Sequence, residues 1–220
     1  MAKVKSLYPS DEQYAEYWTA QKKRAQARVN KSLEPMFDKA KLSCTDAILG
    51  TLGNRRYIKE QDLNRRLRLI KRDPKLKQIE NTIKRLGEKS LQALYENQNP
   101  HYKEEVQSVA EILYPVYYSI GSFTNVSLTG KEQVEVRNKP FQGYKFNELI
   151  NINTQNAIKS WGNNFRQVMS RQDDVSREAL LVKAVKKLLD KQLNQNKVVM
   201  ENSQIEISRK AQKDVEVAIW

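Results

Sequence analysis

Residues 74–93 read PKLKQIENTIKRLGEKSLQA, and this segment decides the fold class. Its apolar and small side chains recur at alternating steps of three and four residues, which is the period of one face of an α-helix. They are Leu76, Ile79, Ile83, Leu86, Ser90 and Ala93. Such steps, sustained over nearly three heptads, are typical of the seam along which helices pack together. We therefore expect a helix whose seam is an interface, with other subunits as its partners.

The flanking segments show the same period and contain signals that start and stop helices. Ser10 and Gln13 form the pattern of a capping box, which predicts a helix from about residue 11 to residue 49. Pro35 lies inside this span, so a kink or a restart is expected there. Other helices are expected over about 56–72, 100–116, 146–169 and 176–193. A short strand is expected at 204–207, before a last helical piece.

The apolar period changes from helical to alternating after Gly121. Thr124, Val126 and Leu128 alternate with polar residues, and Val134 and Val136 alternate again beyond a Thr-Gly turn. This pattern predicts a β-hairpin over residues 122–137. The expected fold is mainly α, a multi-helix bundle with long amphipathic helices and one inserted β-hairpin. Its expected regions are a basic helical region (1–120), the hairpin (121–139) and a C-terminal helical region (140–220).

Composition bounds the class of protein. The chain has 220 residues, of which 39% are hydrophobic and 30% are charged, so it is long enough to bury a core but rich in surface. Its single cysteine, Cys44, excludes an intramolecular disulfide and is expected to be buried. No run of 18 apolar residues and no signal-peptide pattern is present, which favours a protein that is soluble and assembled inside a cell.

Positive charge is concentrated in one part of the chain. Residues 55–89 contain thirteen Lys or Arg and five Asp or Glu, a local net charge of +8 in a chain whose total is +13. Between Arg65 and Arg72 there are four arginines and one lysine and no acid. Arg65, Arg68 and Arg72 lie on the helix face opposite the apolar one. Most charged stripes are merely solvated, but arginine is also the residue that binds phosphate oxygens in bidentate fashion.

We therefore expect this region to contact the backbone of a nucleic acid, with DNA favoured over RNA. The expected contact residues are Arg55, Arg56, Lys59, Arg65, Arg66, Arg68, Lys71, Arg72 and Lys75.

Aromatic residues near the N-terminus allow two interpretations. Tyr14, Tyr17 and Trp18 lie beside Lys22, Lys23, Arg24 and Arg28. This interleaving suits the stacking of single-stranded bases over a basic groove. Aromatic residues at helical spacing more often anchor a core or an interface, so Tyr17 and Trp18 are interpreted as interface residues together with the seam of residues 76–86.

Residues that could carry out catalysis are few. The only histidine, His101, is interpreted as a surface residue because no nucleophile lies in a recognisable turn near it. No Cys/His or Asp-rich spacing suits a metal ion, and no cofactor is expected. Glu135 and Arg137 are similar to part of a metal-dependent nuclease motif, but the lysine and a preceding aspartate are missing. The composition favours a protein that is not an enzyme.

Asparagine is unusually frequent between residues 147 and 164. The positions are Asn147, Asn151, Asn153, Asn156, Asn163 and Asn164. Because asparagine is a mediocre helix former, its presence in a helix calls for an explanation. A polar interface, a pore-facing surface and simple compositional bias are the alternatives.

The Tyr17-Trp18 pair, the basic run after it and the long helix through Phe37 resemble the N-termini of minor head and head–tail connector proteins of tailed bacteriophages. The layout of helices around one hairpin is similar to collar and adaptor proteins. The Arg-Thr-Glu signature of many minor head proteins is absent, and many connectors are acidic. The resemblance implies a virion component close to packaged DNA, which oligomerises and contacts portal or collar subunits.

The leading hypothesis is thus a structural or assembly protein of a phage virion, assembled in the host cytoplasm. The alternative is a stand-alone, cytoplasmic DNA- or RNA-binding protein that acts as a regulator or a replication accessory. A metal-dependent nuclease is a third and weaker hypothesis.

Overall fold

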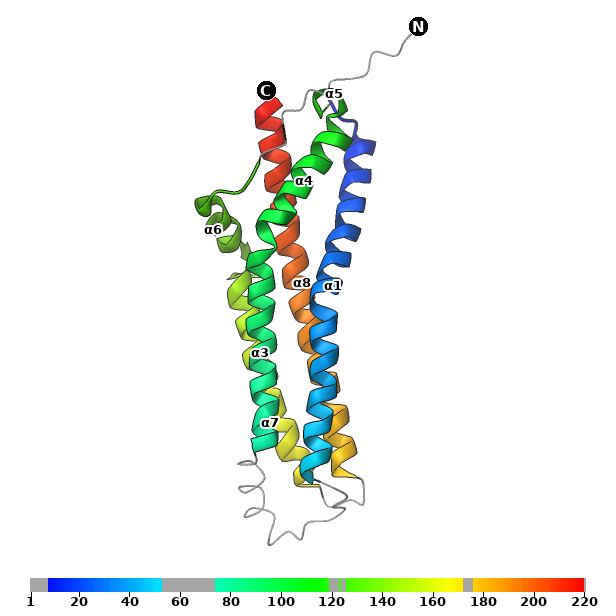
Figure 1. Cartoon of the computed structure of the whole chain (residues 1–220), viewed down its shortest axis with the longest axis vertical. Coiled ribbons are helices and arrows are strands. Elements are labelled where there is room, and N and C mark those ends of the chain that lie inside the picture. Colours follow the sequence, from blue (N-terminus) through cyan, green and yellow to red (C-terminus); the bar gives the residue numbers. More distant parts are fainter. Residues whose placement is uncertain (1–7, 53–73, 119–122, 124–125, 172–175, 220) are drawn as a thin grey trace. The chain divides into compact units, whose positions relative to one another are not determined.

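A computed structural model describes residues 8–52, 74–118, 123, 126–171 and 176–219 of the chain (Figure 1). These ranges contain seven helices and one two-stranded antiparallel hairpin, so the expected mainly α fold is confirmed. The helices are α1 (Asp11–Leu52), α3 (Pro74–Glu96), α4 (Gln98–Leu113), α5 (Pro115–Tyr118), α6 (Gly130–Asn138), α7 (Phe146–Met169) and α8 (Arg177–Ile219). The strands are β1 (Pro140–Phe141) and β2 (Tyr144–Lys145).

Side-chain caps begin α1 and α8 where the sequence predicts them. At α1, the Gln13 backbone N–H donates to Ser10 Oγ (3.3 Å) and the Ser10 N–H donates to Gln13 Oε1 (2.9 Å), which completes the capping box. At α8, the Ala179 N–H donates to Ser176 Oγ (3.3 Å). Each cap satisfies backbone donors that the first helical turn leaves without partners.

The predicted position of the β-hairpin, residues 122–137, is wrong, because residues 130–138 form helix α6. The helix begins at a capping box in which Thr129 Oγ1 accepts from the Glu132 N–H (3.3 Å) and Glu132 Oε2 accepts from the Thr129 N–H (2.9 Å). Val134 and Val136 suggested a strand, but only Val136 is buried. A capping box at the predicted turn therefore outweighs an alternation of only two valines.

The hairpin that the structure contains lies directly after α6, at residues 140–145, and not at residues 122–137. Phe141 pairs with Tyr144, and Pro140 pairs with Lys145. The two residues between the strands, Gln142 (φ 52°) and Gly143 (φ 81°), both have positive φ, as a two-residue turn of type I′ requires.

Helix α8 is continuous through the segment for which a strand was expected at 204–207, so that expectation is also wrong. Ser203, Gln204, Ile207 and Ser208 are all buried, at the spacing of one helical face. Because three of these four are polar, hydrophobic periodicity does not reveal the face. Helix α1 likewise continues through Pro35.

The described residues divide into two compact units that do not follow the order of the chain. Unit 1 comprises residues 1–30, 92–147 and 197–220, and unit 2 comprises residues 31–91 and 148–196. The consecutive regions expected from the sequence differ from these units, since α1 and α8 each contribute to both.

Unit 2 is a four-helix bundle built from parts of α1, α3, α7 and α8 (Figure 1). Between α1 and α8, Lys41 Nζ lies 2.6 Å from Asp190 Oδ1. A layer of buried polar side chains joins the other helices. Asn196 of α8 donates to Ser90 of α3 (3.1 Å) and accepts from Asn153 of α7 (3.1 Å). Such a layer fixes the register of the helices, because each buried polar group needs its own partner.

The seam of α3 lies in the core of this bundle. Leu76 and Leu86 are 4% exposed, and Ile79 and Ile83 are fully buried. Cys44 on α1 is buried as expected, and its burial raises the pKa of its thiol to about 11.

Glycine 87 is required where α3 passes α7. A Cβ built at Gly87 would lie 2.3 Å from Thr154 Oγ1, and the Thr154 hydroxyl is held by its hydrogen bond to the Ile150 carbonyl (2.8 Å). Gly87→Ala is expected to destabilise the protein by about 1–3 kcal/mol, because a methyl group cannot be inserted without moving the bundle.

Gly162, within α7, is the matched control for this substitution. A Cβ at Gly162 meets nothing within 4 Å, so Gly162→Ala should stabilise the protein by about 0.5–1 kcal/mol through helix propensity. Urea denaturation of the two variants measures both effects, and a Gly87→Ala protein as stable as Gly162→Ala would contradict the packing argument.

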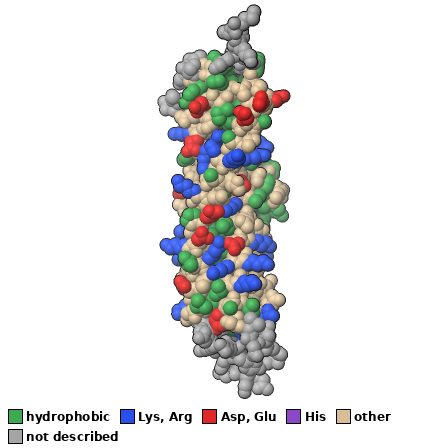
Figure 2. All heavy atoms as spheres, turned by 90° about the vertical axis from the view of Figure 1, so that its right-hand side faces the viewer, with side chains coloured by type: hydrophobic (Ala, Val, Ile, Leu, Met, Phe, Trp, Pro, Cys, Tyr) green, Lys and Arg blue, Asp and Glu red, His purple; other side chains and the backbone are tan. Residues whose placement is uncertain are grey.

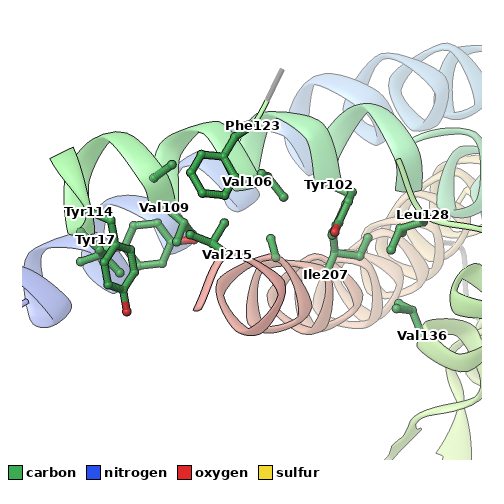
Figure 3. Packing of buried hydrophobic residues seen from close by; sticks show 13 residues of the cluster. Tyr17, Tyr102, Val106, Val109, Tyr114, Phe123, Leu128, Val136, Ile207 and Val215 are labelled. Atoms are coloured by element: carbon green, nitrogen blue, oxygen red, sulfur yellow. The ribbon is translucent and has the colours of Figure 1, made fainter. Parts of the chain in front are cut away.

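The core of unit 1 is formed by parts of α1, α4 and α8, with residues of the α5–α6 segment and α6 added to it (Figure 3). Its members are Tyr17, Tyr102, Val106, Val109, Ala110, Leu113, Tyr114, Phe123, Leu128, Val136, Ile207, Ala211 and Val215. Three of these are tyrosines, and each has a polar partner for its hydroxyl group. Tyr102 donates to Asp214 Oδ2 (2.7 Å), and Tyr114 donates to Glu216 Oε1 (3.1 Å). The tyrosines therefore bury their rings in the core while each hydroxyl group keeps a hydrogen-bond acceptor.

Candidate nucleic-acid interface

Most of the expected phosphate-contact residues lie outside the described residues. This is the case for Arg55, Arg56, Lys59, Arg65, Arg66, Arg68, Lys71 and Arg72. Lys75 is described, and it is exposed in the first turn of α3. Its ammonium group donates to the carbonyl oxygen of Gly50 (3.2 Å), near the end of α1.

The remainder of the basic region continues along the solvent side of α3. Lys77, Lys84, Arg85 and Lys89 are exposed, and none has an ion pair with a described residue. Because the apolar seam of the same helix is buried, these four cations lie on the faces of α3 that water reaches. This part of the region therefore has the exposure that contact with a polyanion requires.

The described side chains on one face of the molecule are mixed in charge. On the face drawn in Figure 2, Lys and Arg side chains lie among Asp and Glu side chains and do not form one continuous patch.

The residues expected at a subunit interface are covered by the chain itself. Leu76, Ile79, Ile83 and Leu86 belong to the bundle of unit 2, and Tyr17 is fully buried in unit 1. Trp18 is half-buried against the same core, and its ring meets that of Tyr17 edge to face, with centroids 5.3 Å apart. These side chains stabilise the fold of one chain.

Arg24 and Arg28 face a buried carboxylate and do not form a basic groove for stacked bases. Glu105 of α4 is fully buried, and its Oε2 accepts from the Tyr17 hydroxyl (2.8 Å) and from Arg24 Nη2 (3.4 Å). Its Oε1 lies 3.4 Å from Arg28 Nη2. Tyr17, Arg24 and Arg28 are therefore used inside unit 1 and do not support the stacking interpretation, whereas Lys22 and Lys23 are exposed.

His101 belongs to the same cluster and is only 3% exposed, so its interpretation as a surface residue is wrong. Its Nε2 lies 3.3 Å from the carbonyl oxygen of Gln204, and its Nδ1 contacts Arg28 Nη1. Since a carbonyl only accepts and a guanidinium only donates, the hydrogen is assigned to Nε2. Burial, with Arg28 beside the ring, lowers the pKa of His101 to about 4, so the ring is neutral at pH 7.

Sequence reasoning missed Glu105 altogether. The only available signal is the spacing of His101 and Glu105, four residues apart on one helical face. Nothing in the sequence indicates that Tyr17, Arg24 and Arg28, more than 70 residues away, pack against that face.

Arg137, one of the two residues of the nuclease hypothesis, packs and hydrogen-bonds within unit 1. The guanidinium of Arg137 lies 4.5 Å from the centroid of the Tyr95 ring, and its Nε donates to Gln98 Oε1 (2.9 Å). These contacts attach α6 to α3 and α4. In the ranges that the structure describes, no three His, Cys, Asp or Glu side chains gather as a metal site would require.

Among the described helices, none combines the length and apolar composition needed to cross a bilayer. No family model, curated protein or solved structure matches the chain.

Proposed function

We propose that this protein is a non-enzymatic helical assembly protein that contacts the backbone of a nucleic acid through its basic region, residues 55–89. The observation that carries the proposal is the local net charge of +8 in that region. Four exposed cations on α3 support it, namely Lys77, Lys84, Arg85 and Lys89. They form no ion pair with the described residues, so their charges are available to phosphate groups.

The proposed setting is the virion of a tailed bacteriophage, as a head–tail connector, a minor head protein or an internal protein. The resemblance of the segment from Tyr17 to Phe37 is the basis for this part of the proposal. A protein there lies next to packaged DNA, where contact with phosphate groups needs no sequence specificity.

Charge reversal within the basic region of residues 55–89 tests the nucleic-acid contact. The variant R65E/R68E/R72E should bind a labelled duplex much more weakly, and the slope of log affinity against log salt should become shallower by about 2–3. Fluorescence anisotropy between 50 mM and 300 mM NaCl, roughly, measures the slope.

A matched variant controls for the change in total charge. K22E/K103E/K213E reverses three exposed lysines of unit 1 that have no ion pair with a described residue. If both variants lower affinity equally while circular dichroism shows that they are folded, net charge alone explains binding and the assigned region is incorrect.

Oligomeric state tests the assembly role separately. Light scattering should show an assembly much larger than the 25.7 kDa chain, alone or with a portal or collar subunit. A monomer or dimer that still binds duplex DNA would replace the assembly role with that of a stand-alone nucleic-acid-binding protein.

A further inference from the structure

A groove of about 510 Å³ lies between α7 and α8 within unit 2. Its volume falls in the range of sites that hold a molecule of nucleotide size. The side chains that line it are mostly basic or neutral and polar, and they come from both helices.

Three lysines give the groove its charge. Lys159 of α7 and Lys187 and Lys191 of α8 line it, and no Asp or Glu is among its described lining residues. The nearest acid in sequence is Asp190, whose Oδ1 is bound by Lys41 Nζ (2.6 Å) between α8 and α1. Because that carboxylate is neutralised by another lysine, the three groove lysines are left as uncompensated positive charge.

Three of the six asparagines noted between residues 147 and 164 lie in the neutral part of the wall. Asn156, Asn163 and Asn164 all line the groove. Asparagine weakens a helix relative to alanine, so three in one groove cost helix stability without contributing to the core. Their amides can both donate and accept hydrogen bonds, as recognition of a phosphate and a sugar or base requires.

A buried amide beside the groove lacks one hydrogen bond. Gln192 lines the groove and is 1% exposed, and its Nε2 donates to Thr154 Oγ1 (3.3 Å). The Thr154 hydroxyl uses its proton on the Ile150 carbonyl (2.8 Å), so Thr154 can only accept from Gln192. The amide orientation is thereby determined, and Gln192 Oε1 has no partner among the described residues.

Together these features define the chemistry of an occupant. The lysines attract an anion, and the exposed amides of Asn156 and Asn163 can donate to and accept from a sugar or a base. A phosphate ester attached to a sugar and a base offers both the anion and these hydrogen-bonding groups. We propose that this groove is a second nucleic-acid contact, which takes one phosphodiester segment of a strand; the inference rests on the proposed function and adds a site outside the basic region of residues 55–89.

Two double substitutions on the same helix test the site in the full-length protein. K187Q/K191Q removes two lysines of the groove, and K183Q/K186Q removes two exposed lysines of α8 that do not line it. Both variants lose the same charge. With a labelled 20-nucleotide single strand, the groove variant should have a salt slope shallower by about 1.4, while the control variant should keep the wild-type slope.

A third variant separates nucleic-acid recognition from simple attraction of charge. N163A/N164A removes neutral groups, so it should weaken binding about three- to tenfold with no change in the salt slope. The same variant should leave the binding of a poly-glutamate peptide unchanged, because a flexible acidic peptide is attracted by the lysines alone.

The outcomes distinguish this inference from the function on which it rests. Equal salt slopes for K187Q/K191Q and K183Q/K186Q would overturn the groove while R65E/R68E/R72E still weakens binding. An equal loss of poly-glutamate and oligonucleotide binding in N163A/N164A would show a general polyanion site and would also overturn it. No binding of any nucleic acid by the wild-type chain, even near 50 mM salt, would reject the proposed function itself.

Discussion

Glu105→Ala is expected to lower the free energy of unfolding by about 3 kcal/mol, whereas Glu104→Ala should lower it by less than about 1 kcal/mol. The two residues are neighbours on α4, and both lie close to Arg28 Nη2, at 3.4 Å for Glu105 and 2.9 Å for Glu104. They differ in burial, since the Glu105 side chain is 0% exposed and the Glu104 side chain is 59% exposed.

The difference follows from what each carboxylate leaves behind. Without Glu105, the Tyr17 hydroxyl loses its acceptor inside the core, and Arg24 and Arg28 lose their buried counter-charge. The side chains of Arg24 and Arg28 are 31% and 28% exposed and regain some hydration, so the cost lies at the low end of the range for a broken buried pair. Without Glu104, Arg28 loses an exposed partner that water replaces.

Urea denaturation at pH 7 compares the two variants on equal terms. Equal losses of stability would show that the burial of Glu105 has no energetic consequence, and the description of the cluster would then be incorrect. The variant E105Q should lose less stability than Glu105→Ala and more than Glu104→Ala, because it keeps an acceptor for the Tyr17 hydroxyl group while removing the charge.

Acidification is expected to destabilise unit 1 through His101, by about 3 kcal/mol between pH 6.5 and pH 4. The pKa of this ring falls from 6.5 to about 4 because the ring is buried and lies beside Arg28; Arg24 acts in the same direction, and the nearby Glu105 opposes the change. Below pH 6.5 the unfolded chain binds a proton that the folded chain does not. Stability therefore falls with pH until the folded state is also protonated, near pH 4.

The variant H101Q isolates this effect. Glutamine can accept from Arg28 and donate to the Gln204 carbonyl, but it does not titrate. Its stability should be nearly independent of pH between 6.5 and 5, where the wild type already weakens. Glu132 acts in a lower window, because Lys210 and the Thr129 cap lower its pKa from 4.5 to about 2. Parallel curves for H101Q and the wild type between pH 6.5 and 5 would contradict the assignment.

Local signals in the sequence were sufficient for the helices whose buried face is apolar. Leu76, Ile79 and Ile83 mark α3 at helical spacing, and Ser10 marks the start of α1, because these signals depend only on neighbouring residues. They failed in α8, where Ser203, Gln204 and Ser208 occupy the buried face. They also failed at α6, where two alternating valines were given more weight than a capping box.

The two candidate sites also differ in whether local sequence signals reveal them. The concentration of charge in residues 55–89 is a property of the sequence alone and needs no coordinates. The groove could not be predicted, since the asparagines of α7 and Lys187 and Lys191 of α8 converge only when the two helices pack. The abundance of asparagine was visible in the sequence. The role of the asparagines that line the groove depends on which side chains of α8 lie opposite them.

By itself the sequence determined that the chain is helical, where most helices begin, and that its positive charge is concentrated in one region. Only the tertiary structure decided that the seam of α3 is internal, that His101 is buried and neutral, and that Glu105 is bound by Tyr17, Arg24 and Arg28. The physical reason is that periodicity and capping act within a few residues. The partner of a buried polar group, in contrast, is set by packing between segments that are distant in the chain.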